Sequence, residues 1–583
     1  MARGVPVAVP VSRQETPSHT CRLLLSLFLL LLPVMSCSAA RAHPSGAASA
    51  KADSASAQAP AETTAAQRIV VHQNVGDAND VRVSIGIPFP PSMLRDAHEV
   101  RILDATGNEV PSHVRATLLW YARDRSIRAV RAQFEAQLTK GEGTYYFAVG
   151  KPRTRDLAGW PYAKELVPDA HGVRVAPALG TLTPQWLCAS LIAGPQMPAP
   201  KGEAYAKYVS AQFEWAKNLP ADDHTAWLFD RPTTLFKAYV RTGRFDYLQA
   251  AEQSYHFYMK YIKRDGLPFS PFCGGGWTYG KEPCDVKYVY IEPILLALAL
   301  TGDDSEHDAE LVDKIATLWQ HNGWSGEPGP YTDPGQRFTE RLAGLGLLAE
   351  ISAYELTGEP RYLAHAKERV GWLYEHQRNN PDKLGDDGSW RNSWNLHEDD
   401  SWHPEHDVRG TSPWMSENIV DGLWRTWLVT GDARIPEMIT AFGRYMERYG
   451  WINVDTIVQG HEWRNPCSGP NGQIAWYWSS AHAPRAKLAD IEDSDGWYSD
   501  AHNVELTMPV AAAYYFERDP AQSEALRRRV EALASSYSNE CAQISETVRR
   551  FNWNNRGAGV AMWFMQQPPG SGATAPLAAH TAP

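Results

Sequence analysis

The chain has 583 residues, of which 43% are hydrophobic and 21% are charged, so it is long enough for two or three globular domains. Its net charge of −11 argues against a nucleic acid or an anionic membrane surface as the partner, although it does not exclude an acidic glycan. Trp and Tyr number 22 and 25, and aromatic side chains either fill a core or offer flat faces to a ligand.

The first 37 residues are typical of an export signal. Arginines precede an apolar run at 23–34, which is too short to span a bilayer and suits the core of a signal peptide. The sequence VMSC that ends at Cys37 resembles a bacterial lipobox, so we expect cleavage before Cys37 and lipidation of its thiol. Ordinary secretion with cleavage a few residues later is the alternative. Both interpretations predict export, either as a periplasmic or outer-membrane-anchored lipoprotein or as a secreted protein.

Two segments of low complexity are predicted to lie outside the folded domains. Residues 38–67 are rich in Ala, Ser and Pro and are predicted to form a flexible tether. Residues 567–583 are predicted to form a disordered tail. Export makes disulfides possible, and Cys273 and Cys284, which flank a glycine-rich loop, are the pair we expect to be bridged. Sequence alone does not determine cysteine pairing.

Residues 68–155 consist of short runs with period-two alternation, separated by turn signals. This pattern predicts a small antiparallel β-domain, either a barrel or a sandwich. The segment 156–202 is rich in Pro and irregular, so we expect a connecting segment with room for one short hairpin.

The order of short motifs in the β-domain resembles the N-terminal barrel of the exo-acting rhamnogalacturonan lyase family and its relatives. The motifs are IGIPFP at 85–90, DATG at 104–107, Trp120, DRSIR at 124–128 and a closing hairpin at 141–147. The family has Asp-Gly-Ser after the Trp, whereas Arg125 stands in place of the Gly here. In that family the barrel precedes a helical toroid, so the resemblance implies this architecture and, more weakly, lyase chemistry.

From 203 to 566 one pattern recurs, in which a helical run, a tight turn and a second amphipathic run follow one another. The five copies lie at 235–262, 292–319, 342–377, 417–450 and 504–537. The first four turn at Thr-Gly, and Gly is the residue that ends helices in the left-handed region. The first helices are the more apolar, so they are predicted to form an inner ring with the second helices outside. Residues 203–218 and 560–565 could complete a sixth pair, so the pattern predicts an (α/α)5-6 toroid, with an open solenoid as the alternative.

If the tight turns lie at one end, the long links between the pairs emerge at the other end, where we expect the pocket. The third of these links, 378–416, is the richest in titratable and aromatic side chains. Its candidate catalytic residues are His397, Asp399, Asp400, His403 and His406, and its candidate sugar-stacking residues are Trp390, Trp394, Trp402 and Trp414.

The other links add further candidates. Arg337 and Arg341 lie four apart and could clamp a uronate carboxylate, or could form a solvated pair that bridges to Glu340. His502 and Glu505 share one face at the start of the fifth inner helix, as an active-site pair or as helix caps. The remaining candidates are Tyr279 for catalysis and Trp277, His461 and Trp463 for substrate binding.

These residue types allow three kinds of chemistry. A carboxylic acid could protonate a glycosidic oxygen while a second carboxylate acts as base or nucleophile. A His or Tyr could remove the proton at C5 of a uronic acid while Arg neutralises its carboxylate, which leads to β-elimination. Carboxylates and imidazoles could also hold a divalent cation such as Ca²⁺, although no HExxH or EF-hand pattern is present. The alternative without a catalytic role is that these charged residues form a solvated loop and pair with one another.

Together these patterns predict an exported carbohydrate-active enzyme with a polysaccharide or oligosaccharide substrate and no cofactor. The expected reaction is that of a polysaccharide lyase on a glycan containing uronic acid. A glycoside hydrolase on the same toroid and a non-catalytic glycan-binding lipoprotein are the alternatives. The oligomeric state is left open.

Overall fold

The computed structural model describes residues 66–199, 204–217, 227–261, 286–305, 309–321, 326, 338–394, 407–453, 473–494, 502–536 and 550–573. Cys37, Cys273 and Cys284 lie outside these residues, so the lipidation and the disulfide stay predictions. Among the described helices, none combines the length and the apolar character needed to cross a membrane.

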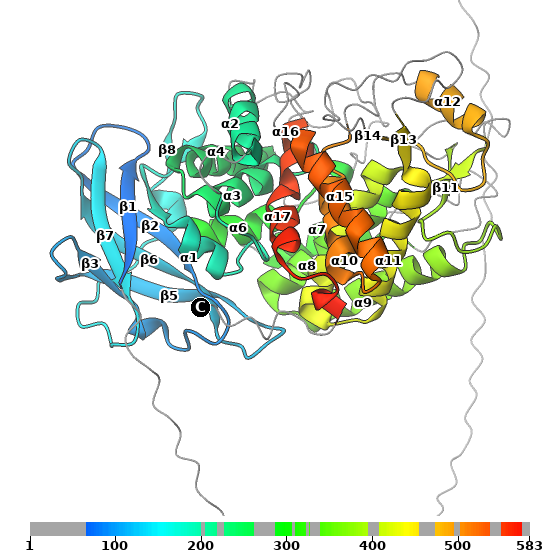
Figure 1. Ribbon diagram of the computed structural model, residues 1–583. Helices are drawn as coiled ribbons and strands as arrows, with labels where there is room; N and C mark the ends of the chain where they lie inside the picture. Colours follow the sequence, from blue (N-terminus) through cyan, green and yellow to red (C-terminus); the bar gives the residue numbers. More distant parts are fainter. Residues whose placement is uncertain are drawn as a thin grey trace, which may run out of the picture. The chain divides into compact units, whose positions relative to one another are not determined.

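The N-terminal strands form two antiparallel sheets. The first has the order β10-β1-β7-β3-β4, and its strands are β1 (Gln67–Gln73), β3 (Arg101–Asp104), β4 (Glu109–Val110), β7 (Glu142–Ala148) and β10 (Ala178–Leu182). The second has the order β2-β6-β5, and its strands are β2 (Asp80–Pro88), β5 (Ser112–Leu119) and β6 (Ile127–Gln137). Figure 1 shows these strands in blue and cyan, next to the helices in green.

Apolar side chains of the two sheets meet in one core. Phe134 of β6 packs 5.0 Å from Tyr145 of β7, and Phe89, which follows β2, packs 5.9 Å from Phe147 of β7. The alternation in β5 buries Ser112, Val114 and Leu118 and is interrupted at Ala116, where the pairing with β6 shifts register. The expectation of an antiparallel β-region is therefore confirmed.

The segment 156–202 is more ordered than its composition suggests. It contains the expected hairpin, β8 (Val167–Pro168) with β9 (Arg174–Val175), and also the helix α1 (Pro184–Ala189). Strand β10 from the same segment pairs with β1 and extends the first sheet. All five of its side chains are buried, so it lacks the alternation by which a half-exposed strand is found in a sequence.

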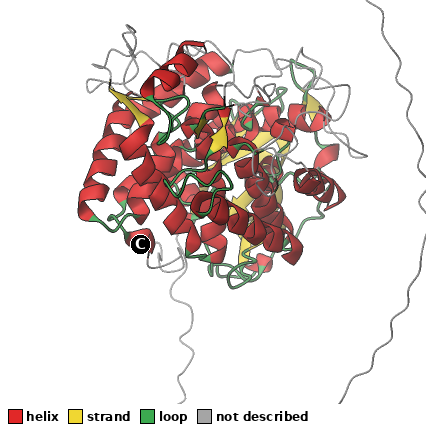
Figure 2. Ribbon diagram, turned by 90° about the vertical axis from the view of Figure 1, so that its right-hand side faces the viewer, coloured by secondary structure: helices red, strands yellow, loops and turns green. Residues whose placement is uncertain are grey.

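The five repeated segments each fold into two helices. The first helices are α3 (Arg231–Thr242), α6 (Glu292–Leu300), α8 (Glu340–Thr357), α10 (Pro413–Thr430) and α14 (Thr507–Phe516). The second helices are α4 (Phe245–Tyr261), α7 (Ala309–His321), α9 (Pro360–Arg378), α11 (Arg434–Tyr445) and α15 (Pro520–Ser536). The segments suggested for a sixth pair contain α2 (Ala204–Ala216) and α17 (Ala558–Gln566), and the helices dominate the view in Figure 2.

Shorter elements complete the described chain. They are α12 (Arg485–Ser494), α16 (Arg550–Arg556), β11 (Asn392–Ser393), β12 (Arg409–Gly410), β13 (Trp451–Asn453), β14 (Gln473–Ala475), η1 (Ala97–Glu99), η2 (Tyr162–Lys164), η4 (Val286–Tyr288), the π-helical η7 (Met446–Gly450) and η9 (Ser571–Ala573). β11 pairs with β12, and β13 pairs with β14, both in antiparallel orientation.

The Thr-Gly turns behave as the sequence predicts. The φ angles of Gly243, Gly302, Gly358 and Gly431 are 64°, 74°, 73° and 65°, all in the left-handed region. Gly358 has a second constraint, because a Cβ at this position would collide with the ring of Tyr121 from the β-region. Only glycine satisfies both the dihedral angle and the close approach.

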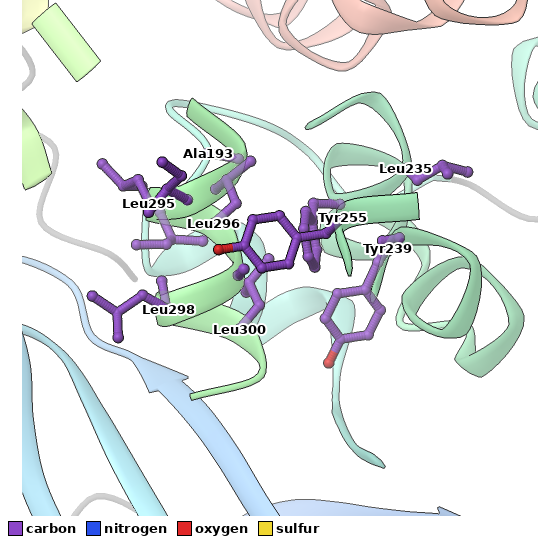
Figure 3. Close-up of a cluster of buried hydrophobic side chains, with 14 of the residues drawn as sticks. Ala193, Leu235, Tyr239, Tyr255, Leu295, Leu296, Leu298 and Leu300 are labelled. Carbon is purple, nitrogen blue, oxygen red and sulfur yellow. The ribbon is translucent and has the colours of Figure 1, made fainter. Parts of the chain in front are cut away.

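The first helix of each pair is buried along almost its whole length. The second helices α7, α9, α11 and α15 expose one side, whereas α4 exposes only Gln249 and Lys260 among its described side chains. Figure 3 shows part of this core, with buried side chains from α3, α4 and α6 and from the segment after α1; those labelled are Ala193, Leu235, Tyr239, Tyr255, Leu295, Leu296, Leu298 and Leu300. A fully buried leucine contributes about 1.5–3 kcal/mol relative to an exposed one. The more apolar helices are therefore the more deeply buried ones, whereas the inner and outer rings of a toroid stay a prediction.

The inner helices contact one another in a closed order. Helix α3 packs against α6, α6 against α8, α8 against α10, α10 against α14, α14 against α17, and α17 against α3. The β-region packs against these helices from the side of the tight turns. A Cβ at Gly86 of β2 would meet the backbone of Ala299 at the end of α6, and Arg131 of β6 forms an ion pair of 2.5 Å with Asp304 after that helix.

Candidate active site

Aromatic rings from four separate segments meet around Trp414, in the first turn of α10. Its ring centroid lies 4.1 Å from His502, 5.8 Å from Tyr477, 5.9 Å from Trp553 and 6.4 Å from Phe229. Phe229 precedes α3, Tyr477 follows β14, His502 precedes α14 and Trp553 belongs to α16. We call these five residues the aromatic cluster. It lies at the N-terminal ends of inner helices, opposite the Thr-Gly turns.

His502 has a defined orientation within this cluster. Its ring stacks against both Trp414 and Trp553, with centroid distances of 4.1 and 4.6 Å and interplanar angles of 13° and 26°. Its Nδ1 hydrogen-bonds to Oε1 of Glu505, and both side chains are buried. When the Glu505 carboxylate accepts this bond, Nδ1 carries the proton and Nε2 is the basic nitrogen. A carboxylate that orients an imidazole in this way is a recurring arrangement for proton transfer.

A cation lies against the same rings. The guanidinium carbon of Arg341, in the first turn of α8, is 5.8 Å from the ring centroid of Trp414 and 6.0 Å from that of Phe229. Contacts at this distance are attractive because the face of an aromatic ring carries partial negative charge. Arg341, Trp414 and His502, which the sequence placed on three different links, are thus brought together.

Glu340 connects the starts of two inner helices. Its Oε1 accepts hydrogen bonds from Oγ1 of Thr411 at 2.8 Å and from the backbone N–H of Ser412 at 2.9 Å. The side chain is fully buried, and this burial raises its pKa to about 7. Sequence reasoning assigned Glu340 only as an ion-pair partner of the arginines, because desolvation is not visible in a sequence.

A second acidic side chain lies one helical turn below Trp414. Glu417 of α10 is buried, and it forms no hydrogen bond or ion pair with any described residue. A Cβ at Gly557 would be 3.1 Å from its Oε1, so it faces the helix pair α16–α17. Burial, followed by the nearby charge of Asp421, raises its pKa well above the usual range. A raised pKa favours the protonated form of this carboxyl group, which is the form that can donate a proton.

Ion pairs fill the space between the inner helices beneath this layer. Glu292 of α6 pairs with Lys237 at 3.3 Å, with Arg556 at 3.2 Å and with Arg425. Arg556 also pairs with Asp421 at 3.2 Å. Although burial alone would raise it, the three cations hold the pKa of Glu292 well below its usual range. Glu292 therefore stays charged, and the cations around it compensate its buried charge.

The same network extends to the β-region. Arg425 of α10 pairs with Glu355 of α8 at 2.6 Å, and Glu355 pairs with Arg128 of β6 at 3.0 Å. All of these side chains are buried or nearly so. A β-strand thus takes part in positioning the inner helices that carry the aromatic cluster.

The backbone before α3 is held in an unfavourable conformation. Phe229 and Asp230 have φ angles of 63° and 61°, which are rare for residues with a Cβ. The Asp230 side chain caps α3 through the N–H of Thr233 at 3.1 Å, and burial raises its pKa to about 6. Strain of this kind persists where the surroundings impose it, which is common at functional sites.

The predicted residues have three different outcomes. Trp394 joins the edge of the site, because its ring lies 6.2 Å from Tyr477 and 5.5 Å from Trp478. Trp390 is a correction: its indole is fully buried 5.3 Å from Phe442 and donates to the carbonyl of Leu373, so it packs in the core between α9 and α11. The residues outside the described part of the chain are Trp277, Tyr279, Arg337, His397, Asp399, Asp400, Trp402, His403, His406, His461 and Trp463.

The chain on both sides of the predicted catalytic loop is nevertheless described. Trp394 and Asp407 bracket 395–406, and the N–H of Trp394 donates to the carbonyl of Val408 at 3.0 Å. The pairing of β11 with β12 closes this loop at its base. Since Trp394 also contacts Tyr477, the loop starts and ends beside the aromatic cluster.

Sequence reasoning missed Tyr477, Trp553, Arg556 and Glu417. The signal for Glu417 is its spacing of three from Trp414, which puts a carboxyl group on the inner face of a buried helix. The other three could not be found, because their segments show no repeat. Within the described residues, no group of three or more His, Cys, Asp or Glu side chains is placed to hold a metal ion.

Comparisons with known proteins add little to this site. No protein-family model matches the chain, and no curated protein matches it. Among solved structures the chain is similar to a polysaccharide lyase, with 10% sequence identity and a TM-score of 0.24. The match covers 62% of this chain and spans only 57% of the length of the lyase chain. A likeness of this size does not establish a shared fold or a shared reaction.

Proposed function

We propose that the protein is an exported carbohydrate-active enzyme, and specifically a lyase that cleaves a glycan containing uronic acid by β-elimination. The observation that carries this proposal is the convergence of Arg341 and the His502–Glu505 pair on the ring of Trp414. A carboxylate-binding cation, an oriented base and a sugar-stacking ring are the three components that this reaction needs.

In the proposed reaction Arg341 binds the carboxylate of the uronic acid and makes the proton at C5 more acidic. Nε2 of His502 removes that proton, and Glu505 stabilises the resulting imidazolium. The electron pair forms the C4–C5 double bond, and the C4–O bond breaks. Glu417, whose pKa is raised well above the usual range by burial, gives its proton to the departing oxygen. No cofactor takes part, so turnover is expected to persist in the presence of a chelator of divalent cations.

The residues at 395–406 remain candidates within the same proposal. His403 and His406 could replace His502 as the base, since the loop that carries them starts and ends beside the aromatic cluster. Tyr279 is the remaining alternative. The variants His403→Ala and His406→Ala test this assignment, because full activity in both leaves His502 and Tyr279 as the candidate bases.

The proposed architecture is a β-barrel followed by a six-hairpin α/α toroid. The closed order of contacts from α3 through α17 and back to α3 supports the ring, and the tight turns at one end support the hairpins. Export and lipidation at Cys37 belong to the same proposal. Incorporation of labelled palmitate that is lost in Cys37→Ser tests the lipid anchor, and secretion without label contradicts it.

Glycoside hydrolysis is the second candidate, and Glu417 is the observation that favours it. A buried carboxyl group with a raised pKa is the form that protonates a glycosidic oxygen in hydrolases. In that reaction water is added across the cleaved bond, and no double bond forms in the product.

One assay separates the two reactions. The full-length protein is incubated with pectic, alginate-like and neutral glycans, and ultraviolet absorbance and reducing ends are both recorded. Absorbance from an unsaturated uronate establishes elimination, whereas reducing ends without absorbance establish hydrolysis and overturn the proposal. Binding without either product establishes a glycan-binding protein. His502→Ala serves as the matched variant in each arm.

A further inference from the structure

A groove lies on the outer side of the helical region, away from the aromatic cluster. It runs along α11 between α9 and the chain after α14, and it encloses about 900 Å³. None of the five residues of the aromatic cluster lines it. Ligand sites commonly enclose about 300–1,000 Å³, so the groove is large enough for a short oligosaccharide.

A π-helical turn forms part of the wall of the groove. Helix α11 continues as the π-helix η7, Met446–Gly450, and the neighbouring residues Arg448 and Tyr449 both line the groove. π-helical turns are rare and are found frequently at functional sites. Tyr449 is 38% exposed and is one of the two large hydrophobic side chains that are exposed among the described residues. Its ring is supported from beneath by Tyr445 at 5.4 Å.

Arg448 differs from Arg378 and Arg444, which also line the groove. Arg378 pairs with Asp386 at 2.8 Å, and Arg444 donates two hydrogen bonds to Glu517 at 2.7 and 2.8 Å. Arg448 is exposed and has no ion pair or hydrogen bond with any residue in the described part of the chain. Within the described part of the chain, the groove therefore presents in Arg448 a cation without an ion pair or hydrogen bond, next in sequence to the exposed ring of Tyr449.

We propose that this groove is a second, non-catalytic binding site for an acidic oligosaccharide. A sugar ring stacks on Tyr449, and the carboxylate of the same or the next residue is bound by Arg448. The choice of a uronic-acid glycan rests on the proposed function. A site on the outer wall that holds the same polymer as the active site raises the local concentration of substrate.

Affinity electrophoresis of the full-length protein in gels with polygalacturonate, with dextran and with inorganic polyphosphate tests the proposal. The variants are Arg448→Ala/Tyr449→Ala, Tyr449→Phe and, as a control that removes an exposed arginine outside the groove, Arg528→Ala on α15. We expect the double variant to bind polygalacturonate about tenfold or more weakly, while Tyr449→Phe and Arg528→Ala bind as the unmodified protein does. Turnover of short oligosaccharides is expected to be unchanged in all of them.

Retention of polygalacturonate by the double variant overturns the proposal. Equal losses for polygalacturonate and polyphosphate also overturn it, because they indicate a general anion site without sugar recognition. His502→Ala distinguishes this site from the active site. If no glycan is cleaved but the groove still binds polygalacturonate through Arg448 and Tyr449, the proposed reaction fails and the second site stands.

Discussion

The two ends of the helix pairs are built in different ways. At one end the chain turns within a few residues, glycines adopt positive φ angles, and β-strands pack against the turns. At the other end the helices begin with buried Trp, Arg, Glu and His side chains, and the backbone at Phe229 and Asp230 is strained. At the first end the structure depends on backbone geometry, so substitutions that add side-chain atoms are poorly tolerated there. The second end carries groups whose chemistry depends on burial, and it is the end suited to a reaction.

The largest effect is expected for His502. Removing a general base costs about a hundredfold to ten-thousandfold in turnover, so His502→Ala should lose nearly all activity. Glu505→Gln keeps a hydrogen-bond acceptor but removes the charge, and we expect a smaller loss. The thermal unfolding midpoint is measured alongside, because a midpoint close to that of the unmodified protein separates lost chemistry from lost folding. Near-normal turnover in His502→Ala would falsify its role as the base.

Glu340 makes the stability of the folded protein depend on pH, through the end of the helix pairs that carries the aromatic cluster. Its pKa of about 7 in the folded protein lies above the ordinary value of 4.5, so the folded state holds this proton more tightly than the unfolded chain. The resulting stabilisation is fully present below pH 4.5 and is lost as the pH rises through about 7. A shift of this size corresponds to about 3 kcal/mol.

Urea unfolding of Glu340→Gln at several pH values tests this expectation. The free energy of unfolding of the unmodified protein should fall by about 3 kcal/mol more than that of the variant between acidic and mildly alkaline pH. Parallel pH profiles for the two proteins would show that the carboxyl group of Glu340 does not titrate in this range.

At the closed end the expected effects concern folding alone. Gly358→Ala should destabilise the protein by about 2 kcal/mol, because it adds a clash with Tyr121 to the cost of a positive φ angle. Gly385→Ala is the matched control, since Gly385 has φ 91° and no neighbour within 4 Å. We expect about 1 kcal/mol there. Chemical denaturation of both variants measures the difference, and equal losses would contradict the contact with Tyr121.

The smallest effect is expected for Arg341→Lys. The charge is kept, but the planar guanidinium is lost, so a carboxylate can no longer be held by two parallel hydrogen bonds. We expect kcat/KM on a uronic-acid glycan to fall roughly tenfold, or about 1.4 kcal/mol, mostly through KM. Unchanged kinetics on the acidic glycan would remove Arg341 from substrate binding.

The sequence by itself determined the helix pairs and their turns. A period of 3.6 residues and a glycine at the end of each first helix are local signals, and they placed α3 to α15 close to where they lie. The buried strand β10 was missed for the same reason, because an apolar run without alternation has no local signature. Trp390 and Trp414 show the limit clearly: both are tryptophans of one link, yet one packs in the core and the other lies at the centre of the aromatic cluster.

Only the tertiary structure decided which side chains share a site. Phe229, Trp414 and Trp553 lie far apart in the chain and meet because the inner helices pack in a closed order. The raised pKa of Glu417 likewise depends on its desolvation between α10 and the helix pair α16–α17, which no residue near it in sequence reveals. Backbone geometry is a local property and can be read from a pattern, whereas burial and proximity are properties of the packed chain.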